Sequence, residues 1–258
     1  MTLKKFVAIF TLFLLVMPLT WAWNATGHML VAQLAYDQLN EKTKARVANI
    51  LGGDDFITAS VWADDIKAQG NDSMNRWHYI NLPEPYEENV VWAINQSVAV
   101  LKDPKASKAA QKQALKGLLH WVGDIHQPLH ATSRDRGGTL FFLAKNPDGK
   151  NLHQYWDKGA GALPYLKRPL SLKSKQWLQD TAHAWQQAYP PTATQLKQTD
   201  PMQWAQESFL IAQTRGFVGV SPKQVPSSAY QTEVQALTER QIVLAGARLA
   251  QVLNALGN

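Results

Sequence analysis

Three histidines and one aspartate fall within residues 120–130, and their side chains could bind metal ions. At about 3.6 residues per turn, His120 and Asp124 lie one above the other on one helix face, so both can reach the same ion. Pro128 is expected to stop or bend that helix, which lets His130 face a different centre. A lone histidine is more often a packed core residue, but this grouping favours metal binding. The segment therefore predicts a site with more than one ion.

Six of the seven histidines lie in short polar clusters, which indicates a shared site rather than scattered surface residues. His153 and Asp157 repeat the spacing of His120 and Asp124, and we expect them on a second helix. Nitrogen and oxygen ligands without thiolates are typical of catalytic zinc rather than of a closed structural site. The seventh histidine, His183, stands alone and is predicted to be a surface or core residue. Three further clusters lie at residues 23–28, 62–65 and 77–81.

Residues 1–22 have the pattern of a secretory signal peptide, with Lys4 and Lys5 before an apolar stretch and Ala22 at the predicted cleavage site. The apolar stretch is shorter than the roughly 20 residues that a spanning helix needs, so an uncleaved anchor is the weaker alternative. Cleavage would make Trp23 the first residue. We therefore expect an exported protein without a membrane span after processing.

The chain contains no cysteine, so its stability must come from packing and from bound metal rather than from disulfides. Together with the predicted signal peptide, this composition fits a bacterial periplasmic or secreted protein. The formal charge of +6 becomes +4 when the two charges of Lys4 and Lys5 are subtracted, which favours an anionic substrate only weakly. The sequence contains no Lys/Arg block typical of nucleic-acid-binding arms.

Apolar spacing of three and four residues predicts an all-α fold, with helices over residues 29–39, 106–125 and 177–188 and a long final helix. Removing 22 of 258 residues leaves 236, which is within the range of one domain over residues 23–258. One strand is predicted at residues 139–144, and the turn sequence at 146–149 indicates a small β-hairpin. The final helix should place one apolar face against the core, and this face contains Ile242, Ala245, Leu249, Val252 and Leu256.

These motifs resemble the zinc-dependent S1/P1 nuclease family, whose fold is shared with bacterial zinc phospholipase C. The resemblance covers nearly the whole chain after residue 22. It is carried by the Gly-Asp-x-His-Gln-Pro-Leu-His motif at residues 123–130, the glycine pair at 137–138, residues 204–208 and residues 245–250. It implies an all-α single-domain fold of this type with a small β-hairpin.

The resemblance also implies three zinc ions. One ion would be held by Asp64, His78, His120 and Asp124. A second would be held by the amine and carbonyl of Trp23, with His28 and Asp124. The third would be held by His130, His153 and Asp157. In this assignment Asp124 bridges two ions, and His126 is a hydrogen-bonding neighbour of the ligands rather than a ligand.

The implied reaction is hydrolysis of single-stranded DNA and RNA to 5′-nucleotides, with 3′-nucleotidase activity. Three zinc ions bring +6 and three ligand aspartates −3, so the pocket carries a net charge of about +3, which favours phosphate. A water bridging the close pair would have its pKa lowered toward about 7. The resemblance assigns catalytic roles to Asp64, which orients the nucleophile, and to Lys67, which neutralises phosphate where fungal members have arginine.

Substrate contacts are assigned by the same resemblance. Tyr79 would stack on a nucleobase and Asn81 would bind its edge, at positions where fungal members carry Phe and Asp. Asn151 is also predicted to bind substrate. Thr139 follows the glycine pair where Asn is common in the family, so that part of the cleft differs.

Two alternatives stay open. A phospholipase C-like lipid phosphodiesterase could use the same zinc ligands, although Tyr79 and Asn81 favour nucleic acid. A non-catalytic exported protein could use zinc only to hold helices together, but a structural site usually closes with four protein ligands. The sequence indicates no stable protein partner, and we expect a monomer that acts on single-stranded nucleic acid and 3′-nucleotides.

Overall fold

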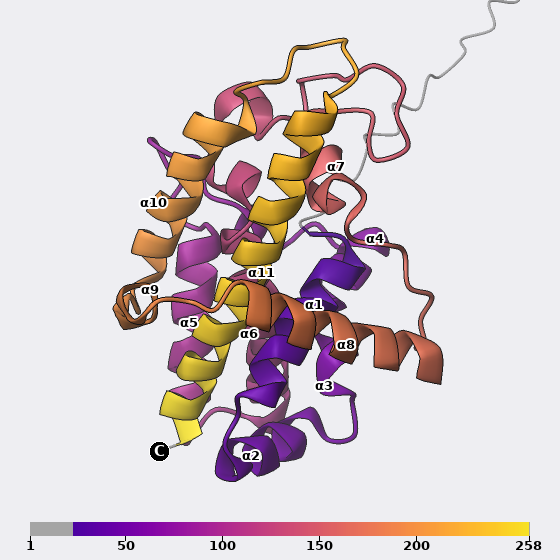
Figure 1. Cartoon of the computed structure of the whole chain (residues 1–258). Coiled ribbons are helices and arrows are strands. Elements are labelled where there is room, and N and C mark those ends of the chain that lie inside the picture. Colours follow the sequence, from indigo (N-terminus) through magenta and orange to yellow (C-terminus); the bar gives the residue numbers. More distant parts are fainter. Residues whose placement is uncertain (1–22, 258) are drawn as a thin grey trace, which may run out of the picture.

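The computed structural model describes residues 23–257, which form a bundle of helices (Figure 1). The predicted signal peptide, residues 1–22, lies outside the described residues. The longer α-helices are α1 (Ala25–Asp37), α2 (Glu41–Leu51), α5 (Val90–Lys102), α6 (Lys108–Ile125), α8 (Leu172–Ala188), α10 (Pro201–Ile211) and α11 (Ser228–Gly257). The predicted all-α fold is confirmed.

Several short helical turns connect these helices. The short α-helices are α3 (Phe56–Ala59), α4 (Trp62–Ala68), α7 (Leu152–Asp157) and α9 (Ala193–Lys197). The 3₁₀ turns are η1 (Asn75–His78), η2 (Pro128–Ala131), η3 (Arg134–Arg136) and η4 (Gly159–Gly161), and η5 (Ala212–Gly216) is a π turn. Elements of this length are too short for apolar periodicity to reveal. Predicted ligands nevertheless lie on four of them, namely α4, η1, η2 and α7.

The four helices predicted from apolar spacing correspond to α1, α6, α8 and α11. Polar residues just before three of them satisfy backbone N–H groups that have no partner within the helix. The side chain of Asn24 accepts from the N–H groups of residues 26 and 27, that of Ser107 from residue 110 and that of Ser171 from residue 174. These caps explain where α1, α6 and α8 begin.

Helix α11 runs along the bundle and packs against α1 and α6, which together enclose the main core (Figure 1). Ile242, Ala245 and Leu249 are fully buried, as the apolar face predicts. Burial extends to every residue from 241 to 250, so this part of the helix is surrounded on all sides. Among the described residues, no helix is both long enough and apolar enough to cross a membrane.

The strand predicted at residues 139–144 does not form. A single antiparallel bridge joins Phe142 to Asn151, and the Leu143 N–H donates to the Lys150 carbonyl at 3.0 Å. The chain does reverse at residues 146–149, where the Asn146 side chain accepts from two backbone N–H groups. The hairpin is reduced to one bridge because the chain turns locally before residue 142 and enters α7 directly after residue 151.

Helix α7 is held by a second, smaller apolar cluster. Leu152, Tyr155 and Trp156 are buried in it, and the Trp156 Nε1–H donates to the Tyr230 hydroxyl of α11 at 3.0 Å. The Tyr230 hydroxyl in turn donates to the Gly216 carbonyl. This packing fixes the helix face on which His153 and Asp157 lie.

Candidate metal centre

The eight histidine and aspartate side chains predicted as ligands are all buried, and they converge from α1, α4, η1, α6, η2 and α7. Buried ionisable groups are rare unless they are paired or bind a metal. Three groups of these side chains place their ligand atoms within 4.8 Å of one another. The groups are His28, Asp64 and His120; His78, His120 and Asp124; and His130, His153 and Asp157. We call the last one the His130 group.

The Asp124 carboxylate lies between His28 on one side and His78 and His120 on the other. Its Oδ1 is 3.4 Å from His28 Nε2, whereas its Oδ2 is 3.0 Å from His78 Nδ1 and 3.3 Å from His120 Nε2. Although burial opposes the charged form, His120 and His78 hold the pKa of Asp124 well below its usual range. The carboxylate therefore presents its two oxygens to two sets of nitrogens, which is the arrangement that a bridging ligand requires.

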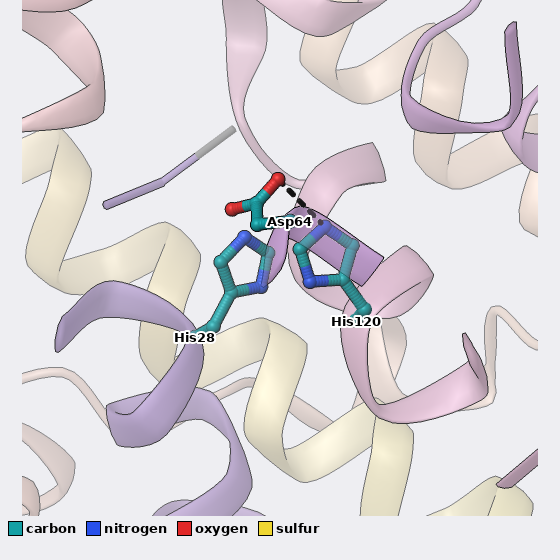
Figure 2. Close-up of side chains that lie close together, drawn as sticks. All are labelled: His28, Asp64 and His120. Atoms are coloured by element: carbon teal, nitrogen blue, oxygen red, sulfur yellow. Dashed lines mark ion pairs between the residues drawn. The ribbon is translucent and has the colours of Figure 1, made fainter. Parts of the chain in front are cut away.

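Figure 2 shows His28, Asp64 and His120 side by side, with ring nitrogens of both histidines toward the carboxylate. The two rings stack at 3.8 Å, and His120 Nε2 is 3.7 Å from Asp64 Oδ1. Among the described residues, neither oxygen of Asp64 and neither ring nitrogen of His28 has a hydrogen-bond partner. Leaving such buried atoms unsatisfied is costly, and a bound cation would satisfy them. The donor set therefore fits a metal ion.

Backbone carbonyls determine the tautomer of three histidines. The Nδ1–H groups of His120, His130 and His153 donate to the carbonyls of Ser60, His78 and Gly137, at 2.8, 2.5 and 2.6 Å. A carbonyl only accepts, so Nδ1 carries a proton, and in the neutral imidazole Nε2 presents its lone pair to the site. A metal-bound histidine commonly donates its other ring N–H in this way.

The His130 group lies beside the start of the described chain. His153 Nε2 is 3.6 Å from Asp157 Oδ2, and the rings of His130 and His153 stack at 4.9 Å. The backbone N–H of Asn24 donates to the Asp157 carbonyl at 2.8 Å, so the residue that follows the buried Trp23 is joined to the backbone of α7. The ligand role of Trp23 stays a prediction.

Most of the ligand histidines are held neutral. Burial lowers the pKa of His130 to about 3 and that of His28 well below its ordinary value. Neutral imidazole is the form that binds metal. His120 differs because, although burial lowers its pKa, Asp124 and Asp64 raise it to about 9. Burial also raises the pKa of Asp157 well above its ordinary value, and a bound cation would favour its charged form.

Lys67 lies one turn after Asp64 on α4 and is half-buried. Burial raises the pKa of Asp64 and Asp157, and the positive charge of Lys67 acts in the opposite direction on both. Its ammonium therefore lies within electrostatic range of carboxylates from two of the groups. The role of Lys67 in neutralising a phosphate stays a prediction.

The predicted substrate residues have different surroundings. Tyr79 and Asn81 are half-buried and follow His78 directly, in a segment joined to η2 by the Ile80 N–H, which donates to the His130 carbonyl at 2.8 Å. Asn151 is buried and caps α7, where its Oδ1 accepts from the backbone of residue 154 at 2.9 Å. Asn151 thus has a clear structural contribution, which is to start the helix that carries two ligands.

His126 lies outside the three groups, and its described contacts do not include a ligand side chain. Its Nδ1–H donates to the Val122 carbonyl at 2.7 Å, and its Nε2 accepts from Arg248 at 3.0 Å. The fully buried Arg248 also binds both oxygens of Glu207, at 2.7 and 3.0 Å. His183 is exposed on α8, which agrees with its separation from the clusters.

Sequence patterns alone do not reveal two further residues of the site. Gln127 donates to a carboxylate oxygen of Asp157 at 2.7 Å. Gly137 has a φ of 65° and supplies the carbonyl that accepts from His153; a Cβ there would lie 2.7 Å from the Leu129 carbonyl oxygen. Both residues lie within recognised motifs, but only the folded chain shows what they contact.

Gly123→Ala should displace His28. A Cβ at residue 123 would lie 2.8 Å from His28 Nδ1. Alanine normally stabilises a helix relative to glycine by about 1 kcal/mol, whereas overpacking destabilises by about 1–3 kcal/mol. We expect a net loss of unfolding free energy and weaker metal binding, measured by urea denaturation and by metal analysis. A gain in stability with unchanged metal content would contradict this prediction.

The unfolding free energy of the metal-free protein should depend on pH through His126. Burial, together with the charge of Arg248, lowers the pKa of His126 to about 3, whereas the ordinary value is 6.5. Between these values the unfolded chain binds the extra proton, so the unfolding free energy falls as the pH falls, by up to about 1.4 kcal/mol per pH unit. We expect the unfolding free energy, measured by urea denaturation at pH 7 and pH 5, to change less between the two pH values in His126→Gln than in the unsubstituted protein. Equal dependence in both proteins would rule out this contribution.

The fold and the site together define an all-α protein with three buried groups of histidine and aspartate side chains that could hold metal ions. A family model described as S1/P1 Nuclease matches residues 23–258, and the chain belongs to this family. The resemblance inferred from the sequence motifs is thereby confirmed. Family membership supports a metal-dependent hydrolase that acts on nucleic acids.

Curated relatives agree with this assignment. The chain is 31% identical to Nuclease S1 of Aspergillus oryzae (strain ATCC 42149 / RIB 40) over an alignment of 158 positions that covers 54% of each protein. It is 25% identical to Endonuclease 2 of Arabidopsis thaliana over an alignment of 275 positions, gaps included, that covers 92% of this chain and 91% of the relative. It is 26% identical to Nuclease P1 of Penicillium citrinum over an alignment of 156 positions that covers 52% of this chain and 57% of that protein. The chain thus aligns with about half the length of the two fungal nucleases and with nine-tenths of the plant enzyme.

Proposed function

We propose that residues 23–258 form one catalytic domain, a zinc-dependent nuclease that hydrolyses single-stranded DNA and RNA to 5′-nucleotides and also acts as a 3′-nucleotidase. The observation that carries this proposal is the convergence of eight buried ligand side chains in three groups, with His28, His78 and His120 around the two oxygens of Asp124 and with no hydrogen-bond partner among the described residues for His28 and Asp64. Nitrogen and oxygen donors with no thiolate suit catalytic zinc.

Three ions are proposed, with Asp124 shared by two of them. The ligands of the first are Asp64, His78, His120 and Asp124. Those of the second are Trp23, His28 and Asp124, and those of the third are His130, His153 and Asp157. Trp23 can contribute an α-amine only if residues 1–22 are removed, so export to the periplasm or the medium is part of the proposal. We expect the processed protein to be a monomer.

When bound, zinc lowers the pKa of a coordinated water toward about 7 and polarises the phosphoryl group. The residues of this chain then have separate roles in the hydrolysis. Asp64, which has no hydrogen-bond partner among the described residues, can orient the attacking water. Lys67 neutralises the phosphate as a point charge. Tyr79 can stack on the base and Asn81 can hydrogen-bond its edge, because an amide both donates and accepts.

Lys67→Ala should lower kcat by about 10- to 100-fold while the zinc content stays unchanged, because the ammonium stabilises charge on the phosphate without being a ligand. Lys67→Arg should retain most of the activity, since arginine keeps the charge and occurs at this position in fungal relatives. Steady-state kinetics with elemental analysis on all three proteins would test this. Unchanged turnover in Lys67→Ala would remove Lys67 from the mechanism.

Product analysis tests the function itself. The processed protein, with its zinc content measured, would be incubated with single-stranded DNA, single-stranded RNA, a DNA duplex and a 3′-nucleotide. We expect 5′-phosphorylated products from the single strands and inorganic phosphate from the 3′-nucleotide. A phosphatidylcholine substrate would be assayed in parallel. Faster cleavage of the lipid than of every nucleic acid would favour the phospholipase C-like alternative.

A further inference from the structure

Gln127 is completely buried between α6 and η2, and both ends of its side-chain amide are bonded. Its Oε1 accepts from the Leu129 N–H at 2.6 Å, and its Nε2 donates to Asp157 Oδ1 at 2.7 Å. A backbone N–H can only donate, so the amide oxygen must face Leu129 and the amide nitrogen must face the carboxylate. The orientation of this side chain is therefore determined by its partners.

The hydrogen bond from the Gln127 amide nitrogen is accepted by one oxygen of Asp157, Oδ1. The other oxygen, Oδ2, faces His153 Nε2 at 3.6 Å. A carboxylate fixed in this way keeps Oδ2 toward His153 and cannot rotate without losing a buried hydrogen bond, which costs about 1–3 kcal/mol.

The backbone of Gln127 is bonded to the other parts of the centre as well. Its N–H donates to the Asp124 carbonyl at 2.9 Å, and its carbonyl accepts from the His130 N–H at 3.0 Å. One residue thus contacts ligands of the His130 group through both its side chain and its backbone, and joins them to the end of α6, which carries the bridging carboxylate.

We propose that Gln127 is a positioning residue of the His130 group, which orients the Asp157 carboxylate so that this group binds its ion as a site separate from the pair around Asp124. The inference rests on the proposed function in one respect, because it assumes that the three groups bind zinc. Capping of η2 requires only the amide oxygen, so the bond from the amide nitrogen to Asp157 is an additional contribution of this side chain.

Two substitutions separate these contributions. Gln127→Glu keeps an oxygen for the Leu129 N–H but replaces the donor to Asp157 with a second carboxylate oxygen. Gln127→Met has a similar volume and removes both contacts. The matched control is Ser208→Ala: the fully buried Ser208 hydroxyl donates to the Ile125 carbonyl at 2.6 Å, so this variant loses a buried bond to the same end of α6 without touching a ligand.

The test measures zinc per chain, the rate at which each zinc is lost to a chelator, and the melting temperature of each protein. We expect Gln127→Glu and Gln127→Met to release one zinc ion about 10- to 100-fold faster than the unsubstituted protein and to keep the other two at unchanged rates. Ser208→Ala should release all zinc at unchanged rates, even if its melting temperature falls.

Unchanged release in both Gln127 variants would overturn the proposal, and so would equal acceleration of all three ions or the same selective loss in Ser208→Ala. The proposed function is tested separately in this experiment. If the unsubstituted protein itself binds no zinc, the function fails, whereas three zinc ions without selective loss in the variants reject only the role of Gln127.

Discussion

Asp124→Ala should remove two zinc ions from the protein at once and lower kcat/KM on single-stranded DNA by about 10³-fold or more. The reason is geometric: one carboxylate oxygen faces His28 while the other faces His78 and His120. Asp64 also lies near His78 and His120, at 3.9 and 3.7 Å, but both of these contacts involve the same oxygen, Oδ1. Elemental analysis of the purified variant and steady-state kinetics would measure both effects.

The matched comparison is Asp157→Ala, which removes a carboxylate of the His130 group only. We expect this variant to lose one zinc ion and keep two, so the two substitutions differ in stoichiometry as well as in rate. Full zinc content in Asp124→Ala would refute the bridging assignment. Loss of all three ions in both variants, with unfolding, would instead indicate that the carboxylates act through the stability of the fold.

Removing the metal with a chelator should abolish hydrolysis and leave most of the helical content intact. The ligands become buried polar groups without a cation, but the main apolar core of α1, α6 and α11 does not depend on them. A ligand present at about 1,000 times its Kd stabilises by about 4 kcal/mol, so we expect the melting temperature to fall by about 10 °C. Circular dichroism and activity on the same samples would measure this.

Adding zinc back should restore both activity and melting temperature, whereas calcium, which prefers six to eight oxygen ligands, should not. Persistence of activity after complete removal of zinc would contradict the proposed chemistry. Loss of helical structure on chelation, together with the absence of any nuclease activity in the zinc-loaded protein, would support the non-catalytic alternative in which zinc only holds helices together.

Local spacing was sufficient to predict the fold class and part of the site. Helices α6 and α7 place His120 with Asp124, and His153 with Asp157, one turn apart, and the structure brings each pair within 3.6 Å or less. Helix α6 ends before Pro128, and the new turn that begins there separates His130 from the α6 ligands. His130 instead lies with His153 and Asp157. These features follow from helix geometry, which the order of residue types determines over a few turns.

The strand predicted at residues 139–144 was wrong, and such patterns could not show why. Its β-branched and aromatic residues favour a strand, but local turns before residue 142 and the start of α7 after Asn151 leave room for one bridge only. Propensity describes what a segment can form alone. In the folded chain, the packing of α7 into its apolar cluster leaves this segment with one bridge instead of a strand.

The sequence by itself determined that this is an all-α chain with histidines and aspartates at metal-binding spacings, because periodicity and helix geometry are local properties. Only the tertiary structure decided that Asp64 and His28 lie against His120, that Asp124 divides its oxygens between histidines, and that Gln127 holds Asp157. These contacts join residues far apart in the chain, and their distances depend on how α1, α4, α6 and α7 pack around a shared core.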